Sequence, residues 1–421
     1  MSKKSKRNRN HTGFQKFVKA TTDVWESYLR TIANLPLELD GGGSLLYPNI
    51  ALFVRTNSHY ILELFGSSEV YKALSVKTHE ESNINKYLYQ FELEKEEEST
   101  PLFSASSNTT TPVTNAGMTN LVLSSPAAIE KFEKRFAFVQ PYKQGYSIIK
   151  GINTSGSLIR FGEAIHEFTF SRCTLLNTLD DSYRAKYINY MQILSSSFNM
   201  EEYKSILERR LFQSIPIQGI STTTDGLFGV QYIPDTEHHS RLLSGQFANM
   251  FLIPGIRETT IGEFLRANPN IVHQAFGCSS FVYEPELEWI EGNEKYPDEK
   301  KINPDLVIER RDGFFDIVDL KTIMDKSKSI TKGAHKRRRF IDYVNEGIAQ
   351  LNNYRDYFSY EKNRNHAFSK YKIKVQEPKL YLVVGSYDNV NDTEVREACR
   401  SHRDDLVIID YDTLNSFFMN G

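Results

Sequence analysis

The sequence predicts an α/β fold, with a sheet packed by helices in its C-terminal part. From about residue 251 onward, segments with helical spacing of apolar residues alternate with short β-branched runs. Their order is helix, several strands, helix, strand, helix, strand, helix, which is typical of a sheet covered by helices. The chain of 421 residues exceeds what one core usually organises, so we expect further domains before this one.

Composition is typical of a globular protein and excludes several other classes. The chain is 40% hydrophobic and 25% charged, and its formal net charge is −2, so any contact with nucleic acid must come from local basic patches. Its three cysteines are widely separated, without disulfide-framework or zinc-ligand spacing, which fits a reducing cytoplasm. No stretch approaches the ~20 consecutive apolar residues that span a bilayer, so we expect a cytoplasmic protein without a membrane partner.

The start of the chain is expected to hold a basic tail and a first mixed α/β domain. Residues 1–12 are rich in Lys, Arg and Asn, a composition that predicts a flexible tail. Residues 13–93 combine apolar positions at helical spacing with a β-like run at 50–54. The acidic and then Ser/Thr/Asn/Pro-rich stretch 94–127 predicts a linker or flexible loop.

A second mixed α/β domain is expected over residues 128–245. Strand-like segments at 146–149 and 158–161 precede segments with helical spacing near 183–196 and 200–211. This region carries no chemistry that we can assign, and a regulatory or sensing role is the hypothesis for it.

Two consecutive strands in the last domain, 251–421, carry the residues that suggest chemistry. Asp305 follows Pro304 at the start of an apolar, β-branched run. After a turn signal at 311–313, a second apolar run leads to Asp319 and Lys321. Because strand side chains alternate between faces, Asp319 and Lys321 share one face, and Asp305 can meet them across the hairpin.

Two carboxylates and a lysine at one site suit a hard divalent cation. Mg²⁺ prefers oxygen ligands, and Mn²⁺ can substitute, so Asp305 and Asp319 are candidate metal ligands. A metal-bound water can attack a phosphodiester, while the metal and Lys321 stabilise charge on the phosphate. The alternative is structural, since Lys321 could simply neutralise Asp319 or Asp305.

Helices on both sides of these strands offer further candidates. The helix expected at 260–267 carries Glu263, which could complete the metal site or could instead cap the helix, because Thr260 and Glu263 form a capping-box pattern. After the strands, Gln350 and Tyr354 are four residues apart on a helix and therefore on one face. Gln350 could orient the water or contact DNA.

The densest basic run of the chain lies between the lysine strand and this helix. A basic cluster of this kind predicts phosphate contact, and a solvated face is the alternative. The candidate DNA-binding residues are Lys332, Lys336, Arg337, Arg338 and Arg339.

Pro304-Asp305 followed by Asp319-Leu320-Lys321 resembles the PD-(D/E)xK nuclease pattern. With the phrase Phe-Leu-x-x-Asn-Pro at 264–269, residues 251–421 resemble the nuclease domain of the Shedu anti-phage defence proteins of bacteria. The pair Gln350 and Tyr354 resembles the fourth motif of RecB-like members of the superfamily. The resemblance implies a restriction-endonuclease-like core, DNA as substrate and a homo-oligomer, with a tetramer favoured over a dimer.

We therefore expect a Mg²⁺-dependent endonuclease that hydrolyses invading phage DNA as a single-gene defence system. The N-terminal half, in which no family motif is recognised, is expected to regulate the nuclease or to sense DNA. Two alternatives stay open: a non-catalytic DNA-binding or scaffold protein that keeps the fold, and an RNA-cleaving toxin. No module that reads a 2′-hydroxyl group is recognisable, so the sequence does not distinguish DNA from RNA.

Overall fold

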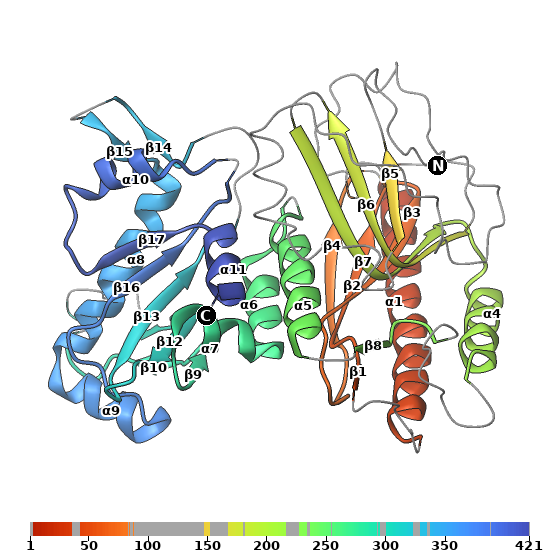
Figure 1. Ribbon diagram of the computed structural model, residues 1–421, viewed down its shortest axis with the longest axis horizontal. Helices are drawn as coiled ribbons and strands as arrows, with labels where there is room; N and C mark the ends of the chain where they lie inside the picture. The colour runs from red at the N-terminus through yellow and green to blue at the C-terminus, as the bar shows by residue number, and fades with distance from the viewer. Residues whose placement is uncertain are drawn as a thin grey trace. The chain divides into compact units, whose positions relative to one another are not determined.

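A computed structural model shows the chain as two compact units, Met1–Asn249 and Met250–Gly421, each of which is described by itself (Figure 1). The structure describes residues 3–35, 43–82, 84, 87, 147–151, 167–179, 182–215, 227–233, 236–253, 255–292, 294, 300–322, 329–334, 337–387 and 389–420. Within these residues, no helix is long and apolar enough to cross a membrane.

The first unit is built on a six-stranded mixed sheet in the order β4-β2-β3-β7-β6-β5. Its strands are β2 (Ile50–Arg55), β3 (His59–Phe65), β4 (Ser75–Glu80), β5 (Ser147–Gly151), β6 (Glu167–Leu179) and β7 (Ser182–Ser195). A separate two-stranded ribbon pairs β1 (Ser44–Leu46) with β8 (Gln231–Ile233). Among the described residues of this unit the helices are α1 (Lys3–Ala33), α4 (Met200–Gln213) and α5 (Thr236–Phe251), of which α5 continues into the second unit.

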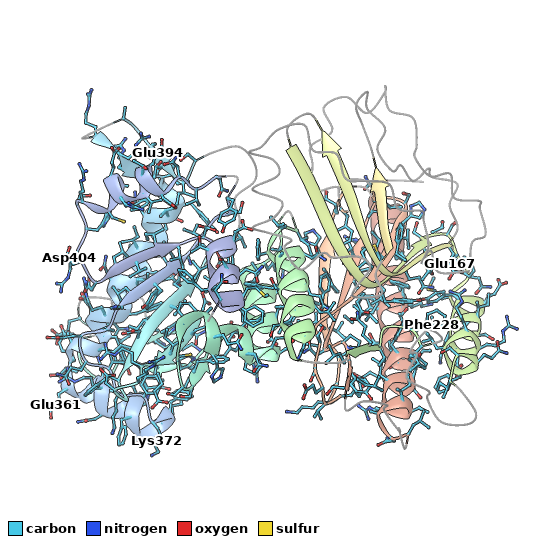
Figure 2. The ribbon with its side chains drawn as sticks, in the orientation of Figure 1. Glu167, Phe228, Glu361, Lys372, Glu394 and Asp404 are labelled. Carbon is cyan, nitrogen blue, oxygen red and sulfur yellow. The ribbon has the colours of Figure 1, made fainter. Side chains whose placement is uncertain are left out.

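Helices α1 and α4 pack together over this sheet, and aromatic side chains fill the core between them. The ring of Phe17 on α1 lies 5.6 Å from Phe53 on β2 and 5.6 Å from Tyr203 on α4, centroid to centroid. A buried polar network also ties the sheet to α4, because Glu167, labelled in Figure 2, accepts hydrogen bonds from Gln192 and Arg210 at 2.7 Å each. Both partners satisfy a carboxylate that would otherwise be costly to bury.

The structure differs from the predictions for the N-terminal half in three respects. The segment predicted as a helix near 183–196 is strand β7, which pairs with β3 and β6, so sheet pairing overrides its helical spacing of apolar residues. Because β3 and β7 pair, the stretches 13–93 and 128–245, predicted as two domains, share one sheet and one unit. Helix α1 begins at Lys3, so the basic stretch predicted as a flexible tail extends the helix, as Lys and Arg readily do.

Other predictions for this half are confirmed or fall outside the described residues. The strand at 50–54 corresponds to β2, the strand at 146–149 to β5, and the helix at 200–211 to α4. The predicted linker 94–127 and the predicted strand 158–161 lie outside the residues that the structure describes.

The second unit is built on a five-stranded mixed sheet in the order β17-β16-β13-β12-β9. Strands β13, β16 and β17 are parallel, and β12 is antiparallel to both of its neighbours, β13 and β9. The strands are β9 (Phe281–Tyr283), β12 (Leu306–Glu309), β13 (Phe315–Leu320), β16 (Leu380–Val383) and β17 (Leu406–Ile409). Two short ribbons accompany them, β10 (Leu287–Glu288) with β11 (Lys301–Ile302) and β14 (Thr331–Lys332) with β15 (Arg339–Phe340).

Helices pack on this sheet in the order that the sequence predicted, which confirms the mixed α/β class of the second unit. Helix α8 contacts β13 and β16, and its residues Val344, Ile348 and Leu351 join the strands in one buried apolar cluster. The helices are α6 (Glu258–Ala267), α7 (Pro269–Phe276), α8 (Asp342–Ser359), α9 (Glu361–Tyr371), α10 (Asp392–Cys399) and α11 (Tyr411–Asn420).

Candidate active site

The hairpin of β12 and β13 brings the predicted charged residues together. Asp305 stands immediately before β12, and its Oδ2 accepts a hydrogen bond from the main-chain N–H of Leu320 at 2.6 Å. Asp319 is near the end of β13, with only 1% of its surface exposed, and Lys321 follows the strand with 7% exposed. The Nζ atom of Lys321 lies 2.7 Å from Oδ2 of Asp319. The predicted meeting of these three residues is what the structure shows.

Helix α8 holds the other side of Lys321. The Lys321 ammonium donates to Oε1 of Gln350 at 3.0 Å. One turn earlier, Gly347 leaves room for the lysine, since a Cβ there would lie 3.1 Å from Cε of Lys321 and 2.8 Å from Cδ1 of Leu382. One turn later, the hydroxyl of Tyr354 donates to the main-chain carbonyl of Asn303 at 3.3 Å. Gln350 and Tyr354 therefore lie on one face, as predicted, and brace the site from the same helix.

Glu258, which the sequence analysis missed, is the acidic residue of helix α6 that meets this group. Its Oε1 accepts hydrogen bonds from the N–H of Thr322 at 3.2 Å and the hydroxyl of Tyr343 at 3.0 Å. Its Oε2 lies 3.9 Å from Nζ of Lys321. An acidic residue in the first turn of a helix is an available sequence signal, because the helix dipole favours it there.

Glu263, the predicted candidate on the same helix, lies beside Arg266, with 3.8 Å between Oε1 and Nη1. The capping-box interpretation of Thr260 and Glu263 is wrong, because helix α6 begins at Glu258 and its N-cap is Arg257. The helix thus starts two residues earlier than predicted, and the acidic residue in its first turn is Glu258.

Residues 255–415 match the family model described as Shedu protein SduA, C-terminal. The chain carries the C-terminal domain of the Shedu family. The matched range contains the whole group formed by Glu258, Asp305, Asp319, Lys321 and Gln350, and membership suggests a role in anti-phage defence. No curated protein matches the chain.

Burial and the charges of neighbouring residues shift the pKa values of the acidic groups and of the lysine in the Shedu domain. Burial, and then the nearby charge of Asp319, raise the pKa of Asp305 to about 7. Burial also raises the pKa of Asp319, although Lys321 partly offsets the effect. Burial alone would lower the pKa of Lys321, but the charges of Asp319, Glu258 and Asp305 keep it above its ordinary value. Lys321 is therefore a fixed cation at neutral pH.

The donor set of the Shedu domain fits Mg²⁺ through two carboxylates. Among the described residues, no three Asp, Glu, His or Cys side chains are grouped closely enough to hold a metal ion. Mg²⁺ does not require three, because it retains several waters and commonly binds one or two carboxylates together with a substrate phosphate. Asp305 and Asp319 could supply two oxygen ligands, and a divalent cation bound there would lower their raised pKa values.

The predicted DNA-binding run of the Shedu domain is only partly available for phosphate. Lys332 is ion-paired with Asp342 at 2.7 Å, and Arg338 is ion-paired with Glu394, labelled in Figure 2, at 2.8 Å. Arg339 at the start of β15 and Arg337, which precedes that strand, are exposed, while Lys336 lies outside the described residues. Of the residues described in this run, Arg337 and Arg339 are the better candidates for a phosphate contact.

Proposed function

We propose that the Shedu domain is a Mg²⁺-dependent endonuclease that hydrolyses phosphodiester bonds of invading phage DNA. The observation that supports it most is the placement of Lys321, a buried cation held between Asp319 and Gln350 beside a second carboxylate, Asp305. Burying an ionised side chain among apolar strand residues costs free energy of folding. Three such side chains at the end of one strand therefore favour a chemical role for the site.

Each residue of the group has a defined task in this proposal. Asp305 and Asp319 hold Mg²⁺ or Mn²⁺, which would activate an attacking water and offset charge on the phosphate. Lys321 stays protonated and stabilises the negative charge that develops on the attacked phosphate, rather than acting as a base. Gln350 and Glu258 position the lysine ammonium, and Tyr343 fixes Glu258 through its hydroxyl.

The 2.7 Å ion pair between Lys321 and Asp319 also supports a second candidate, a DNA-binding scaffold in which the lysine is structural. The two candidates differ in whether the protein cuts. We expect purified protein to cleave DNA with Mg²⁺ or Mn²⁺ and to be inactive with EDTA, as measured on linear and circular DNA, with RNA as a parallel substrate. Binding without cleavage in any metal favours the scaffold.

The same assay tests the raised pKa values of Asp305 and Asp319. Protons compete with the metal for these carboxylates, so the Mg²⁺ concentration for half-maximal cleavage should increase as pH falls from about 8 to about 6. The comparison is made at saturating DNA with cleavage rates as the readout. A half-maximal concentration that does not change with pH contradicts metal binding by these two groups.

Glu258 and Glu263 form a matched pair, because both are glutamates on α6 and only their positions differ. We expect Glu258→Gln to lower the cleavage rate about tenfold, since it keeps the hydrogen-bond acceptor but removes a charge beside Lys321. Glu263→Gln should lower it less, because Glu263 lies beside Arg266. Equal loss in the two variants contradicts a specific role of Glu258 beside Lys321, and a larger loss in Glu263→Gln favours Glu263 as part of the metal site.

The remaining parts of the proposal concern the regions around this site. Arg337 and Arg339 contact DNA phosphates, and Lys336 belongs to the same basic run. The N-terminal unit restrains the nuclease or senses DNA, and the protein assembles as a homotetramer. These proposals rest on the basic composition of the run and on the resemblance to the Shedu family.

A further inference from the structure

A pocket of about 1170 Å³ lies at the amino-terminal ends of the parallel strands in the second unit. Its walls include Phe314, which precedes β13, residues 373–378, which precede β16, and residues 402–405, which precede β17. The carboxylate–lysine site lies at the opposite ends, after Leu320 of β13. Because six strand residues span ~20 Å, the pocket is a separate site.

Helix α9 presents an aromatic ring and a cation to this pocket. Arg364 and Phe368 both line the pocket, and they are four residues apart, so they share one face of the helix. Phe368 is 43% exposed, so part of its ring is accessible to a ligand. The ammonium groups of Lys372, labelled in Figure 2, and of Lys374 each lie 5.3 Å from the centroid of its ring.

The charges of the pocket are separated between two sides. On the side of the α10–β17 loop, Asp405 is ion-paired with Arg355 at 3.0 Å and with Arg403 at 3.3 Å, and Asp404 adds a second negative charge, so acidic and basic residues balance there. On the α9 side, Arg364 donates to the carbonyl oxygens of Phe358 and Ser359, which carry no formal charge. Positive charge is therefore concentrated around Phe368.

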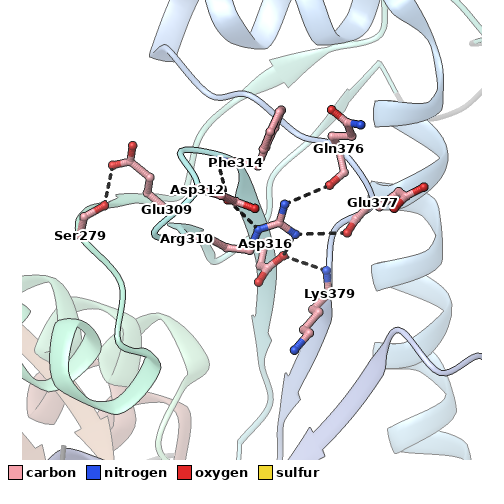
Figure 3. A network of polar contacts seen from close by, with 9 residues as sticks. All are labelled: Ser279, Glu309, Arg310, Asp312, Phe314, Asp316, Gln376, Glu377 and Lys379. Atoms are coloured by element: carbon pink, nitrogen blue, oxygen red, sulfur yellow. Dashed lines mark hydrogen bonds and ion pairs between the residues drawn. The ribbon is translucent and has the colours of Figure 1, made fainter.

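The wall between Lys372 and Glu377 is held in an uncommon backbone conformation. Both residues have left-handed φ angles, 63° and 45°, which cost energy for side chains with a Cβ. Arg310 supports this wall by donating to the carbonyl oxygens of Gln376 at 3.4 Å and Glu377 at 3.3 Å (Figure 3). Strained segments persist where their surroundings hold them, and they concentrate at binding sites.

The buried carboxylate of Asp316 completes this support. Its Oδ1 accepts hydrogen bonds from Nη1 of Arg310 at 3.1 Å and from the N–H of Lys379 at 2.8 Å (Figure 3). The guanidinium of Arg310 also lies 5.8 Å from the ring centroid of Phe314, a pocket residue. Arg310, which lies between β12 and β13, thus contacts the pocket wall formed by Gln376 and Glu377 and also the ring of Phe314.

We propose that this pocket binds a nucleotide, with its base against Phe368 and its phosphate between Arg364 and Lys374. Aromatic rings flanked by cations bind nucleotides through base stacking and phosphate contact, and stacking is stronger than an exposed cation–π contact. A base can therefore replace an ammonium on the ring, and that ammonium then binds the phosphate. A cationic ligand is repelled by the same lysines. The nucleotide is either free or part of a single DNA strand.

The test uses the full-length protein and measures binding of deoxyadenosine monophosphate by calorimetry and of a labelled oligothymidylate by fluorescence anisotropy. Phe368→Ala should weaken binding about tenfold or more, because one stacked base is lost. The matched control is Phe417→Ala, since Phe417 is 47% exposed on α11 and does not line the pocket. Lys374→Gln should weaken binding and reduce its salt dependence.

The probes and variants separate the possible outcomes. Binding of the monophosphate that depends on Phe368 indicates a free nucleotide, whereas binding of the oligothymidylate alone that depends on Phe368 indicates a DNA strand, and either result supports the proposal. Absence of binding by both probes at millimolar concentration overturns it, as does equal affinity in Phe368→Ala and Phe417→Ala. Lys321→Met, which is expected to lose DNA cleavage, should bind the monophosphate as tightly as the wild type does. The test of the pocket can therefore fail independently of the proposed nuclease activity.

Discussion

Replacing Lys321 with methionine should reduce DNA cleavage by about 10²–10³-fold while leaving DNA binding and the fold intact. The methionine keeps the apolar stem that lies against Gly347, but it removes the cation proposed to stabilise the attacked phosphate. Asp319, deprived of its 2.7 Å partner, can take up a proton, because burial already raises its pKa. Single-turnover cleavage rates at saturating Mg²⁺, together with DNA affinity, measure the effect.

Lys301→Met is the matched control for this experiment. Lys301 lies on β11 in the same unit, is exposed, and is ion-paired with Glu286 at 2.7 Å, so the variant also removes a paired lysine charge. Its cleavage rate should equal that of the wild type. If Lys321→Met cleaves at the wild-type rate, the lysine is structural and the proposed chemistry of the site is wrong.

Much of the candidate site could be predicted because it is formed by neighbouring strands. Asp305, Asp319 and Lys321 belong to one hairpin, and the alternation of strand side chains places them together without any distant contact. The prediction that Gln350 and Tyr354 share one face depended only on their spacing along a helix. Glu258 was missed because it reaches Lys321 from a helix far earlier in the chain. Its place in the first turn of α6 is a signal for the start of a helix, but it does not indicate which residue Glu258 contacts. The role of Gly347 could not be predicted for a similar reason, because it depends on the close packing of α8 on β16, which is distant in sequence.

The N-terminal half was harder to predict because its sheet depends on distant pairing. Strands β3 and β7 are separated by more than a hundred residues, and neither segment contains information about its partner. In β7, aromatic and apolar residues at 187, 190, 191 and 194 repeat at helical spacing, although the segment is a strand that is paired on both edges and whose residues 188–194 are all buried. A strand that is buried on both faces does not need to alternate apolar with polar residues, so the spacing of its apolar residues does not distinguish a strand from a helix.

Asp305→Asn should have opposite effects on activity and on stability. Cleavage should fall by about 10³-fold, because one of the two proposed Mg²⁺ ligands loses its charge. The fold is preserved, since the amide oxygen of asparagine can still accept the 2.6 Å hydrogen bond from the N–H of Leu320. Stability in the absence of metal should increase, because the substitution removes a buried charge beside that of Asp319.

The sign of the pH dependence follows from the raised pKa of Asp305, about 7 in the folded protein. A carboxyl that binds its proton more tightly when folded favours folding at low pH, and this contribution is lost as pH rises through the folded pKa. At about pH 8 the wild type carries the ionised, buried pair, so Asp305→Asn should be more stable by about 4 kcal/mol, because burial raises the pKa of Asp305 from 3.8 to about 7. Below about pH 4 the wild-type carboxyl is protonated in both the folded and the unfolded protein, and the two proteins should be nearly equal.

Amide hydrogen exchange in β12 and β13 measures this difference within the second unit, without contributions from the first. Mg²⁺ should slow exchange in the wild type at about pH 8 and have little effect in Asp305→Asn, because a ligand stabilises only the state that binds it. Faster exchange in Asp305→Asn than in the wild type, in the absence of metal, contradicts a destabilising charge. A wild-type cleavage rate in this variant contradicts the metal site, and the two readouts fail independently of each other.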